Sequence, residues 1–272
     1  MIQSDVGLPR GILNPGLGSQ NFNLTRKAPP EALGQWIEHF WMVDWDLRGC
    51  EPYLSQTLPH PSVHVVFEEG KSGVMGVVKG RFSTLLSEQG RVFAIKWRPG
   101  GFRGFVEFPI ANITDQRLPV EQVFGSDGKL LETQILASED LEEQIQLASG
   151  FFIERKPGPD ANLTLTHQIM DLVLSYRNIL RVEDLVNVTG MSKRNMQRLF
   201  HEYVGVNPKW VIKRARLHEA VERLATDPEI SLLDLSNELG YFDQAHFIKD
   251  FKSLVGRSPL QYTKKETVDP IQ

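Results

Sequence analysis

The alternation of hydrophobic and polar residues changes its period part-way along the chain. Between about residues 41 and 97, apolar residues recur at every second position in short stretches separated by turns, a period typical of β-strands. From about residue 127 onward, apolar residues recur at intervals of three and four, as in amphipathic helices. The pattern therefore predicts an α+β fold in two domains, with the strands first.

The strand-rich half is predicted to form a small antiparallel β-barrel with flanking helices, because short strands at this spacing indicate a curled sheet. A short helix is expected over Glu31–His39, after two prolines. The expected strands are Trp41–Leu47, Tyr53–Leu58, Ser62–Glu68, Val74–Val78, Phe82–Leu86 and Arg91–Trp97. Two helices are expected between Asp127 and about Arg155, broken near Ser138. They would pack against the barrel or, alternatively, form a contact between two protomers.

The second half is predicted to be entirely helical. The segment Lys156–Pro159 contains two prolines and a glycine, which cannot continue a helix, and it marks the domain linker. Seven helices are expected after it, at about Leu165–Tyr176, Val182–Val188, Ser192–Tyr203, Pro208–Thr226, Leu232–Leu239, Gln244–Val255 and Pro259–Tyr262. The predicted boundaries are residues 1–155 for the barrel domain, 156–162 for the linker and 163–265 for the helical domain.

The helix expected over Ser192–Tyr203 has two chemically different faces. Its apolar stripe consists of Met196, Leu199, Phe200 and Tyr203. Its polar face consists of Arg194, Gln197, Arg198 and His201. Arginine can form two hydrogen bonds with guanine in the DNA major groove, and glutamine can do the same with adenine. The helix is therefore a candidate for DNA recognition, with an ordinary solvated surface helix as the alternative.

The same arrangement occurs a second time. Aligning Ser192 with Asp243 places Met196 over Phe247 and Phe200 over Phe251. The polar residues Arg198 and His201 align with Lys249 and Lys252, respectively. The pattern predicts two helix-turn-helix units in tandem. The helix expected between them is about 28 Å long at about 1.5 Å per residue, close to the roughly 34 Å between successive major grooves on one side of DNA.

The composition adds a local signal to this picture. The formal net charge is −4, but residues 193–216 contain seven basic residues and one acidic residue, a net of +6. A basic stripe in an acidic protein is expected where DNA phosphates are contacted. The candidate phosphate contacts are Lys193, Lys209, Lys213, Arg214 and Lys252. Solvated charge on a helix surface is the alternative for each of them.

Other classes of function receive little support. The chain has a single cysteine, Cys50, no apolar run long enough to span a membrane and no signal-peptide pattern, so we expect a cytoplasmic protein without membrane contact. Nucleophile-elbow, P-loop and dinucleotide-binding motifs are absent, so no catalytic residue and no cofactor is assigned. His60 and His64 are four residues apart, about 13 Å along a strand, which favours a structural pair over a metal site.

The C-terminal third resembles the AraC/XylS family of bacterial transcription regulators. The resemblance rests on residues 192–224 and on the segment LGYFDQAHFIKDFKSLVGRSPLQY, which carries Gly240, Phe247, Phe251, Gly256, Pro259 and Tyr262. It implies that the second helix of each unit reads bases. The implied base contacts are Arg194, Gln197 and Arg198 in the first unit and Gln244, Ile248 and Lys249 in the second. Ile248 can offer only an apolar contact to a base. This departure from the family pattern implies weaker sequence reading by the second unit.

The N-terminal half resembles, over shorter stretches, the sensor domains of one branch of these regulators. The similar segments are Pro59–Phe67, Trp97–Gly101 and Leu118–Val120. The resemblance implies a cupin-like barrel that binds a small molecule or pairs two protomers. Trp41, Trp97 and Arg98 are the candidate effector-binding residues, with aromatic core and a surface arginine as the alternatives.

Together these observations predict a sequence-specific regulator that binds double-stranded DNA and is controlled by a small-molecule effector. A barrel that acts as an enzyme, or as a dimerisation module alone, stays open as an alternative. The effector is unknown, and contacts with RNA polymerase or with a second copy of the chain are also left open.

Overall fold

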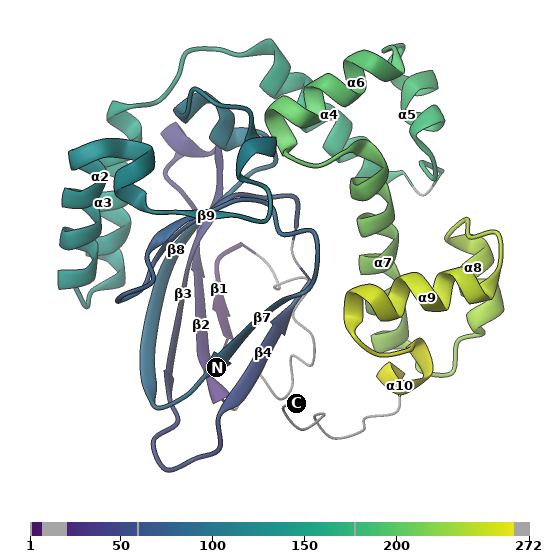
Figure 1. Ribbon diagram of the computed structural model, residues 1–272, viewed down its shortest axis with the longest axis horizontal. Helices are drawn as coiled ribbons and strands as arrows, with labels where there is room; N and C mark the ends of the chain where they lie inside the picture. The colour runs from purple at the N-terminus through teal and green to yellow at the C-terminus, as the bar shows by residue number, and fades with distance from the viewer. Residues whose placement is uncertain (1, 7–20, 59, 177, 264–272) are drawn as a thin grey trace.

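The computed structural model describes residues 2–6, 21–58, 60–176 and 178–263. It contains a strand-rich half and a helical half, which lie beside each other (Figure 1). The α+β class and the two-part architecture expected from the sequence are confirmed. None of the helices within these residues is long and apolar enough to cross a membrane.

The strand-rich half is built from one large curled sheet and one small ribbon. The strands are β1 (Ile2–Ser4), β2 (Asn23–Lys27), β3 (Ile37–Asp46), β4 (Tyr53–Thr57), β5 (His64–Phe67), β6 (Gly73–Met75), β7 (Phe82–Leu86), β8 (Gln89–Trp97) and β9 (Arg117–Leu118). Seven of them form a sheet in the order β1-β2-β3-β8-β5-β6-β9, and β4 pairs with β7 in a separate ribbon. Neighbours are antiparallel except β1 and β2. Within the described residues, no strand pairing joins the ribbon to the sheet, so the curled sheet is open.

The helix expected over Glu31–His39 is wrong. The structure has a single 3₁₀ turn at Glu31–Leu33, and β3 begins at Ile37. The cause is tertiary pairing, because β3 runs antiparallel to β8 from Ile37 to Asp46 and β8 fixes the backbone of this segment as a strand. Leu33, Ile37 and Phe40 are buried as the helix pattern implied, but in a different local geometry.

One face of the sheet is covered by helices and forms the main core. Alternate residues of β8, such as Phe93, Ile95 and Trp97, point into this core. Helices α2 (Val120–Ala137) and α3 (Leu141–Glu154) supply the other side with Leu131, Ile135 and Phe152, among others. The expected break between these two helices is confirmed at Ser138, which caps the C-terminus of α2. The opposite face of the sheet looks toward the β4–β7 ribbon, where Trp41 and Trp45 pack.

The helical half contains α4 (Ala161–Ser175), α5 (Val182–Thr189), α6 (Lys193–Leu199), α7 (Pro208–Thr226), α8 (Leu232–Glu238), α9 (Gln244–Val255) and α10 (Pro259–Thr263). The described residues thus hold the seven helices that the sequence predicts. The bounds of α7 and α9 agree with the prediction at both ends. Each helix is preceded by a capping residue, Asn207 or Asp243, and is followed by a helix breaker, Pro228 or Gly256. A π-helical turn, Phe200–Val204, continues α6.

Direct contacts join the two halves. The guanidinium of Arg103 donates to Oε1 of Glu202 at 2.6 and 2.8 Å. The Thr114 hydroxyl donates to the carbonyl oxygen of Gly205 at 2.6 Å. Two apolar residues of the strand-rich half, Leu58 and Val77, are fully buried in clusters formed by the helical half. The helical half is therefore held against the strand-rich half at both of its ends.

Backbone segments of the strand-rich half approach each other very closely at Gly76. A Cβ atom at this position would lie 1.8 Å from the carbonyl oxygen of Ile113, whereas a Cβ at Gly80 would have no atom within 4 Å. We therefore expect Gly76→Ala to reduce the free energy of unfolding by roughly 1–3 kcal/mol and Gly80→Ala to change it by less than about 0.5 kcal/mol. Urea unfolding of both variants measures this difference, and equal stabilities would contradict the packing described here.

Candidate nucleic-acid interface

Each predicted recognition helix begins at a side-chain cap and ends at a glycine. Ser192 caps α6 by accepting a hydrogen bond from the amide of Asn195, and Asp243 caps α9 by accepting from the amide of His246. Such caps satisfy amide groups that the first turn of a helix leaves unpaired. Gly205 and Gly256, which follow the two helices, both have positive φ angles of 86° and 89°. The sequence repeat is thus also a repeat of local structure.

The apolar stripes of both helices are buried. Met196 and Phe200 of the first unit are fully buried, as are their counterparts Phe247 and Phe251 in the second. Each pair belongs to a separate hydrophobic cluster, so each unit has its own core. Burial of one stripe fixes the rotation of each helix about its axis, and the polar face is turned outward as a consequence.

The outward faces carry most of the residues predicted to contact bases. Arg194, Gln197 and Arg198 are exposed on α6, and Lys249 is exposed on α9. Gln244 is half-buried at the start of α9. Ile248 also lies partly buried, packed against the core of the second unit, and this placement does not favour it as a base contact. Ala245 and His246 are exposed beside Lys249 instead.

The predicted phosphate contacts fall into two groups. Lys209 and Lys252 are exposed. Lys193 is exposed, but its ammonium lies 2.9 Å from Oε1 of Glu183. Lys213 lies 2.6 Å from Oδ1 of Asp250, so that it links α7 to α9. In both of these lysines an acidic neighbour offsets part of the charge.

The structure does not favour Arg214 as a phosphate contact. Its exposed fraction is 3%, since α7 turns this residue toward the interior, between the two halves. Burial lowers the pKa of Arg214 to about 9, so the side chain remains charged at neutral pH. The sequence could not separate Arg214 from its neighbours, because basic residues on a predicted helix are usually exposed.

The long helix α7 joins the two units. Asn207 caps its N-terminus, Pro208 occupies the first turn, and it runs for 19 residues. In the view of Figure 1, α6 and α9 run in the same direction across the picture, one above the other, and α7 connects them. The two exposed polar faces are therefore carried by equivalent helices at the two ends of one rod.

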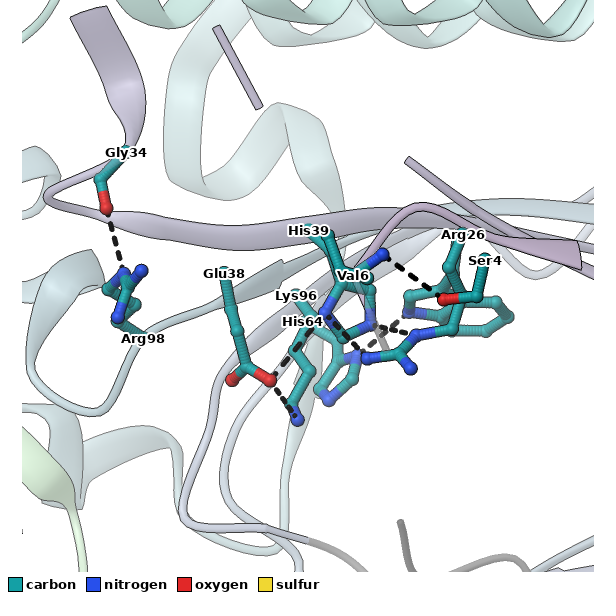
Figure 2. Close-up of polar contacts among 10 residues, drawn as sticks. Ser4, Val6, Arg26, Gly34, Glu38, His39, His64, Lys96 and Arg98 are labelled. Atoms are coloured by element: carbon teal, nitrogen blue, oxygen red, sulfur yellow. Dashed lines mark hydrogen bonds and ion pairs between the residues drawn. The ribbon is translucent and has the colours of Figure 1, made fainter. Parts of the chain in front are cut away.

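The residues predicted to bind an effector are not brought together. Trp97 is fully buried in the main core, in contact with Phe102, Phe105 and Phe152. The indole N–H of Trp41 donates to Nδ1 of His64 at 3.2 Å, on the opposite face of the sheet. Arg98 is exposed, and Figure 2 shows its Nε donating to the carbonyl oxygen of Gly34 at 2.8 Å. The burial of Trp97 therefore favours the alternative given above, in which it is part of the aromatic core, over a role in binding an effector.

Sequence reasoning missed a group of polar residues on the ribbon-facing side of the sheet, which we call the polar cluster. It consists of Arg26, Glu38, His39, His64 and Lys96 (Figure 2). Arg26, His39 and Lys96 are buried. A signal was present, because Lys96 interrupts the apolar run Val92–Trp97 at a position where a strand inside the protein would carry a hydrophobic residue.

His60 and His64 have different neighbours. The imidazole ring of His60 lies 4.5 Å from that of His218 on α7, and His64 accepts the bond from Trp41. His60 therefore belongs to the boundary between the halves and His64 to the polar cluster.

The glycines of the first unit allow a test of the contact between the halves. Gly190 and Gly205 both have positive φ angles, but a Cβ at Gly190 would meet nothing, whereas a Cβ at Gly205 would lie 2.9–3.1 Å from atoms of Ile110 and Thr114. We expect Gly190→Ala to cost roughly 1–2 kcal/mol through backbone strain, and Gly205→Ala roughly 2–4 kcal/mol because it adds crowding. Thermal unfolding of the two variants measures the difference, and a smaller loss in Gly205→Ala would argue against the contact.

Comparison with known proteins gives two domain matches. Residues 185–265 match a family described as a helix-turn-helix domain, and residues 25–119 match a domain of unknown function (DUF6597). Both matches agree with the halves seen in the structure.

The similar curated proteins are regulators. An uncharacterized HTH-type transcriptional regulator of Haemophilus influenzae is 34% identical over 88 residues, which are 32% of this chain and 29% of that protein. The Msm operon regulatory protein of Streptococcus mutans is 27% identical over 100 residues, 36% of each chain. The HTH-type transcriptional activator AarP of Providencia stuartii is 31% identical over 90 residues, 33% of this chain and 66% of that protein. The matches thus span about a third of the first two relatives.

Among solved structures, ToxT of Vibrio cholerae overlays on 89% of this chain and 96% of its own, with 15% identity and a TM-score of 0.38. The C-terminal domain of AraT, a response regulator from Geobacillus stearothermophilus, overlays on 42% of this chain and 92% of its own, with 20% identity and a TM-score of 0.34.

Proposed function

The chain belongs, through its helical half, to the AraC/XylS family of transcription regulators, and we propose that it binds specific sequences in double-stranded DNA through α6 and α9. One observation carries the proposal. Two equivalent helices bury their apolar stripes and expose polar side chains, with Arg198 and Lys249 at corresponding positions. A helix with this division can enter a major groove and contact base edges.

The spacing of the two helices supports binding to successive major grooves. Helix α7 has 19 residues, which corresponds to roughly 28 Å at about 1.5 Å per residue. Successive major grooves on one side of DNA are roughly 34 Å apart. A single chain would then place each unit in its own major groove, with the two units about one turn of DNA apart.

The exposed residues suggest a division of roles. We propose Arg194, Gln197 and Arg198 as base contacts of the first unit and Lys249, with His246 beside it, as those of the second. Gln244, at the start of α9, remains a candidate. Lys193, Lys209 and Lys252 would neutralise phosphates, which contributes affinity without sequence preference.

Selection of bound DNA from random duplexes tests the proposal directly. We expect recovered sequences to contain two short conserved blocks about one helical turn apart. Loss of the block nearer one end in an Arg198→Ala protein would assign that block to α6. Recovery of no enriched sequence, or of one block only, would contradict the two-groove arrangement.

Arg198→Ala is expected to weaken binding by roughly 1–3 kcal/mol at its cognate base and to relax specificity there, because a two-pronged arginine–guanine contact is lost. Lys209→Ala is expected to weaken binding to all sequences about equally and to reduce the salt dependence, since it removes a phosphate contact. Titration of labelled duplexes at several salt concentrations separates the two effects.

Lys71→Ala serves as the control, because Lys71 is exposed in the turn between β5 and β6 and pairs with Glu68. Its DNA binding should equal that of the unmodified chain. Unchanged affinity and base preference in Arg198→Ala would argue against α6 as a reading helix.

We also propose that a small-molecule effector bound by the strand-rich half controls DNA binding in the cytoplasm. The Arg103–Glu202 pair and the burial of Leu58 and Val77 in the helical half support this, since a change in one half would be felt in the other. Transcription assays with purified RNA polymerase would distinguish activation from repression.

Pairing of two copies through α2 and α3 completes the proposal. Leu130 is 59% exposed and Ile153 is 36% exposed, and a groove of about 630 Å³ lies between the helices beside Leu147 and Phe151. We expect the chain to sediment as a dimer and Leu130→Glu to sediment as a monomer, because a charge in an apolar interface is costly. A monomeric unmodified chain at micromolar concentration would contradict dimerisation.

A further inference from the structure

Phe242 is the most exposed large apolar residue in the part of the chain that the structure describes. Its exposed fraction is 95%, whereas Leu233 and Leu260 of the same unit are 55% and 60% exposed. Phe242 lies in the turn between α8 and α9, directly before the capping residue Asp243. An aromatic side chain exposed to this extent leaves a large apolar surface in contact with water.

The exposure of Phe242 is imposed by its two neighbours. Tyr241 is 7% exposed, and its ring centroid lies 5.3 Å from that of Phe247 in the second core. The amide of Tyr241 also donates to the carbonyl oxygen of Ser236 at 2.9 Å. On the other side, Asp243 is held by its cap on the first turn of α9. Phe242 is thus fixed outside the core at the start of the predicted recognition helix.

The outward face of α9 differs from that of α6. When the two helices are aligned at their caps, Arg194 corresponds to Ala245, and Gln197 corresponds to Ile248. Arginine and glutamine can each form paired hydrogen bonds with a base, whereas both counterparts in α9 are apolar. Ala245 is exposed and Ile248 is half-buried. With Phe242 before them, these residues give α9 an apolar start where α6 is polar.

The charges follow the same division. The first turn of α6 carries Lys193 and Arg194, whereas residues 244–246 of α9 are glutamine, alanine and histidine. The exposed lysines of α9, Lys249 and Lys252, lie further along the helix. Attraction to phosphates therefore comes from the later turns of α9, and its start has a different means of contact.

The surroundings of Phe242 fit DNA better than an apolar protein surface. Protein interfaces are formed around contiguous patches with several apolar side chains. Leu233 lies in the first turn of α8, at the opposite end of that helix from Phe242, and Leu260 lies on α10. The exposed neighbours of Phe242 along the chain, Asp243 and His246, are polar. A single aromatic ring in a polar setting suits a groove lined by bases and phosphates.

We propose that Phe242 determines specificity in the second unit by contacting the 5-methyl group of a thymine in the major groove, with Ala245 beside it. The first turn of a recognition helix approaches base edges, and phenylalanine and alanine both make apolar contacts with this methyl group. The inference rests on the proposed DNA binding through α9 and names the feature that this helix reads. The first unit then reads hydrogen-bonding edges, and the second reads a methyl group.

Replacement of thymine by deoxyuridine tests the methyl contact, because it removes the methyl group and keeps every hydrogen-bonding group of the base. The duplex is the one recovered by selection, and the block that the Arg198→Ala protein still recovers is the block of α9. We expect deoxyuridine at one position of this block to weaken binding about three- to fivefold. Deoxyuridine in the block of α6 should change binding less than about twofold. A block of α9 without thymine, or equal effects in the two blocks, would overturn the proposal.

Two substitutions at Phe242 test the side chain. Phe242→Ser should weaken binding to the thymine duplex roughly tenfold and remove the difference between the thymine and deoxyuridine duplexes, because the apolar partner of the methyl group is lost. Phe242→Leu should retain most of the affinity and the difference, since it keeps an apolar side chain. Weaker binding of Phe242→Ser with an unchanged preference for the methyl group would overturn the proposal. Unchanged DNA binding with a loss of transcription would also overturn it, in favour of a protein partner.

Leu85→Ser is the matched control, because Leu85 is an exposed apolar residue on β7, in the strand-rich half. Its DNA binding and its preference for the methyl group should equal those of the unmodified chain. Thermal unfolding of Phe242→Ser should also be unchanged, so a loss of binding reports on the contact. Recovery of no enriched duplex would overturn the proposed function and this inference with it. Recovery of two blocks without any dependence on the methyl group would count against this inference alone.

Discussion

Burial of one apolar stripe in each predicted recognition helix, α6 and α9, is the constraint on which the remaining structure depends. Phe200 and Phe251 fill equivalent places in two separate cores, and each fixes the rotation of its helix. The side chains that face solvent are then decided without further interactions. Helix α7 holds the two units at a fixed separation. The two small cores therefore determine how the exposed polar faces of both α6 and α9 are oriented.

The sequence allowed the helical half to be predicted almost completely, whereas the strand-rich half was predicted less well. Capping residues and helix breakers are local signals, and Pro208–Thr226 could be delimited from them alone. Strand pairing is not local. The segment Glu31–His39 has a helical pattern, but its partner β8 lies about sixty residues away and imposes a strand on its second part.

The same reasoning explains which site residues could be anticipated. Exposure of Arg194, Gln197 and Arg198 follows from helical periodicity. The burial of Arg214 depends on where the other half of the protein lies, which no periodicity encodes. The polar cluster depends on strand register and on one bulge at Glu38, both of which are set by pairing across the sheet. Only the isolated Lys96 in an apolar run gave a sign of it.

Leu58 and Val77 lie in the strand-rich half but complete the two cores of the helical half. The halves are therefore not interchangeable modules, although each resembles a separate domain family. A helical half expressed alone would lack the side chains of Leu58 and Val77 and would have an unfilled apolar cavity in each of its two cores. A chimera that exchanges strand-rich halves between relatives would have to supply side chains of matching shape at both positions. Divergence of this chain is constrained in pairs of positions that lie roughly ninety or more residues apart.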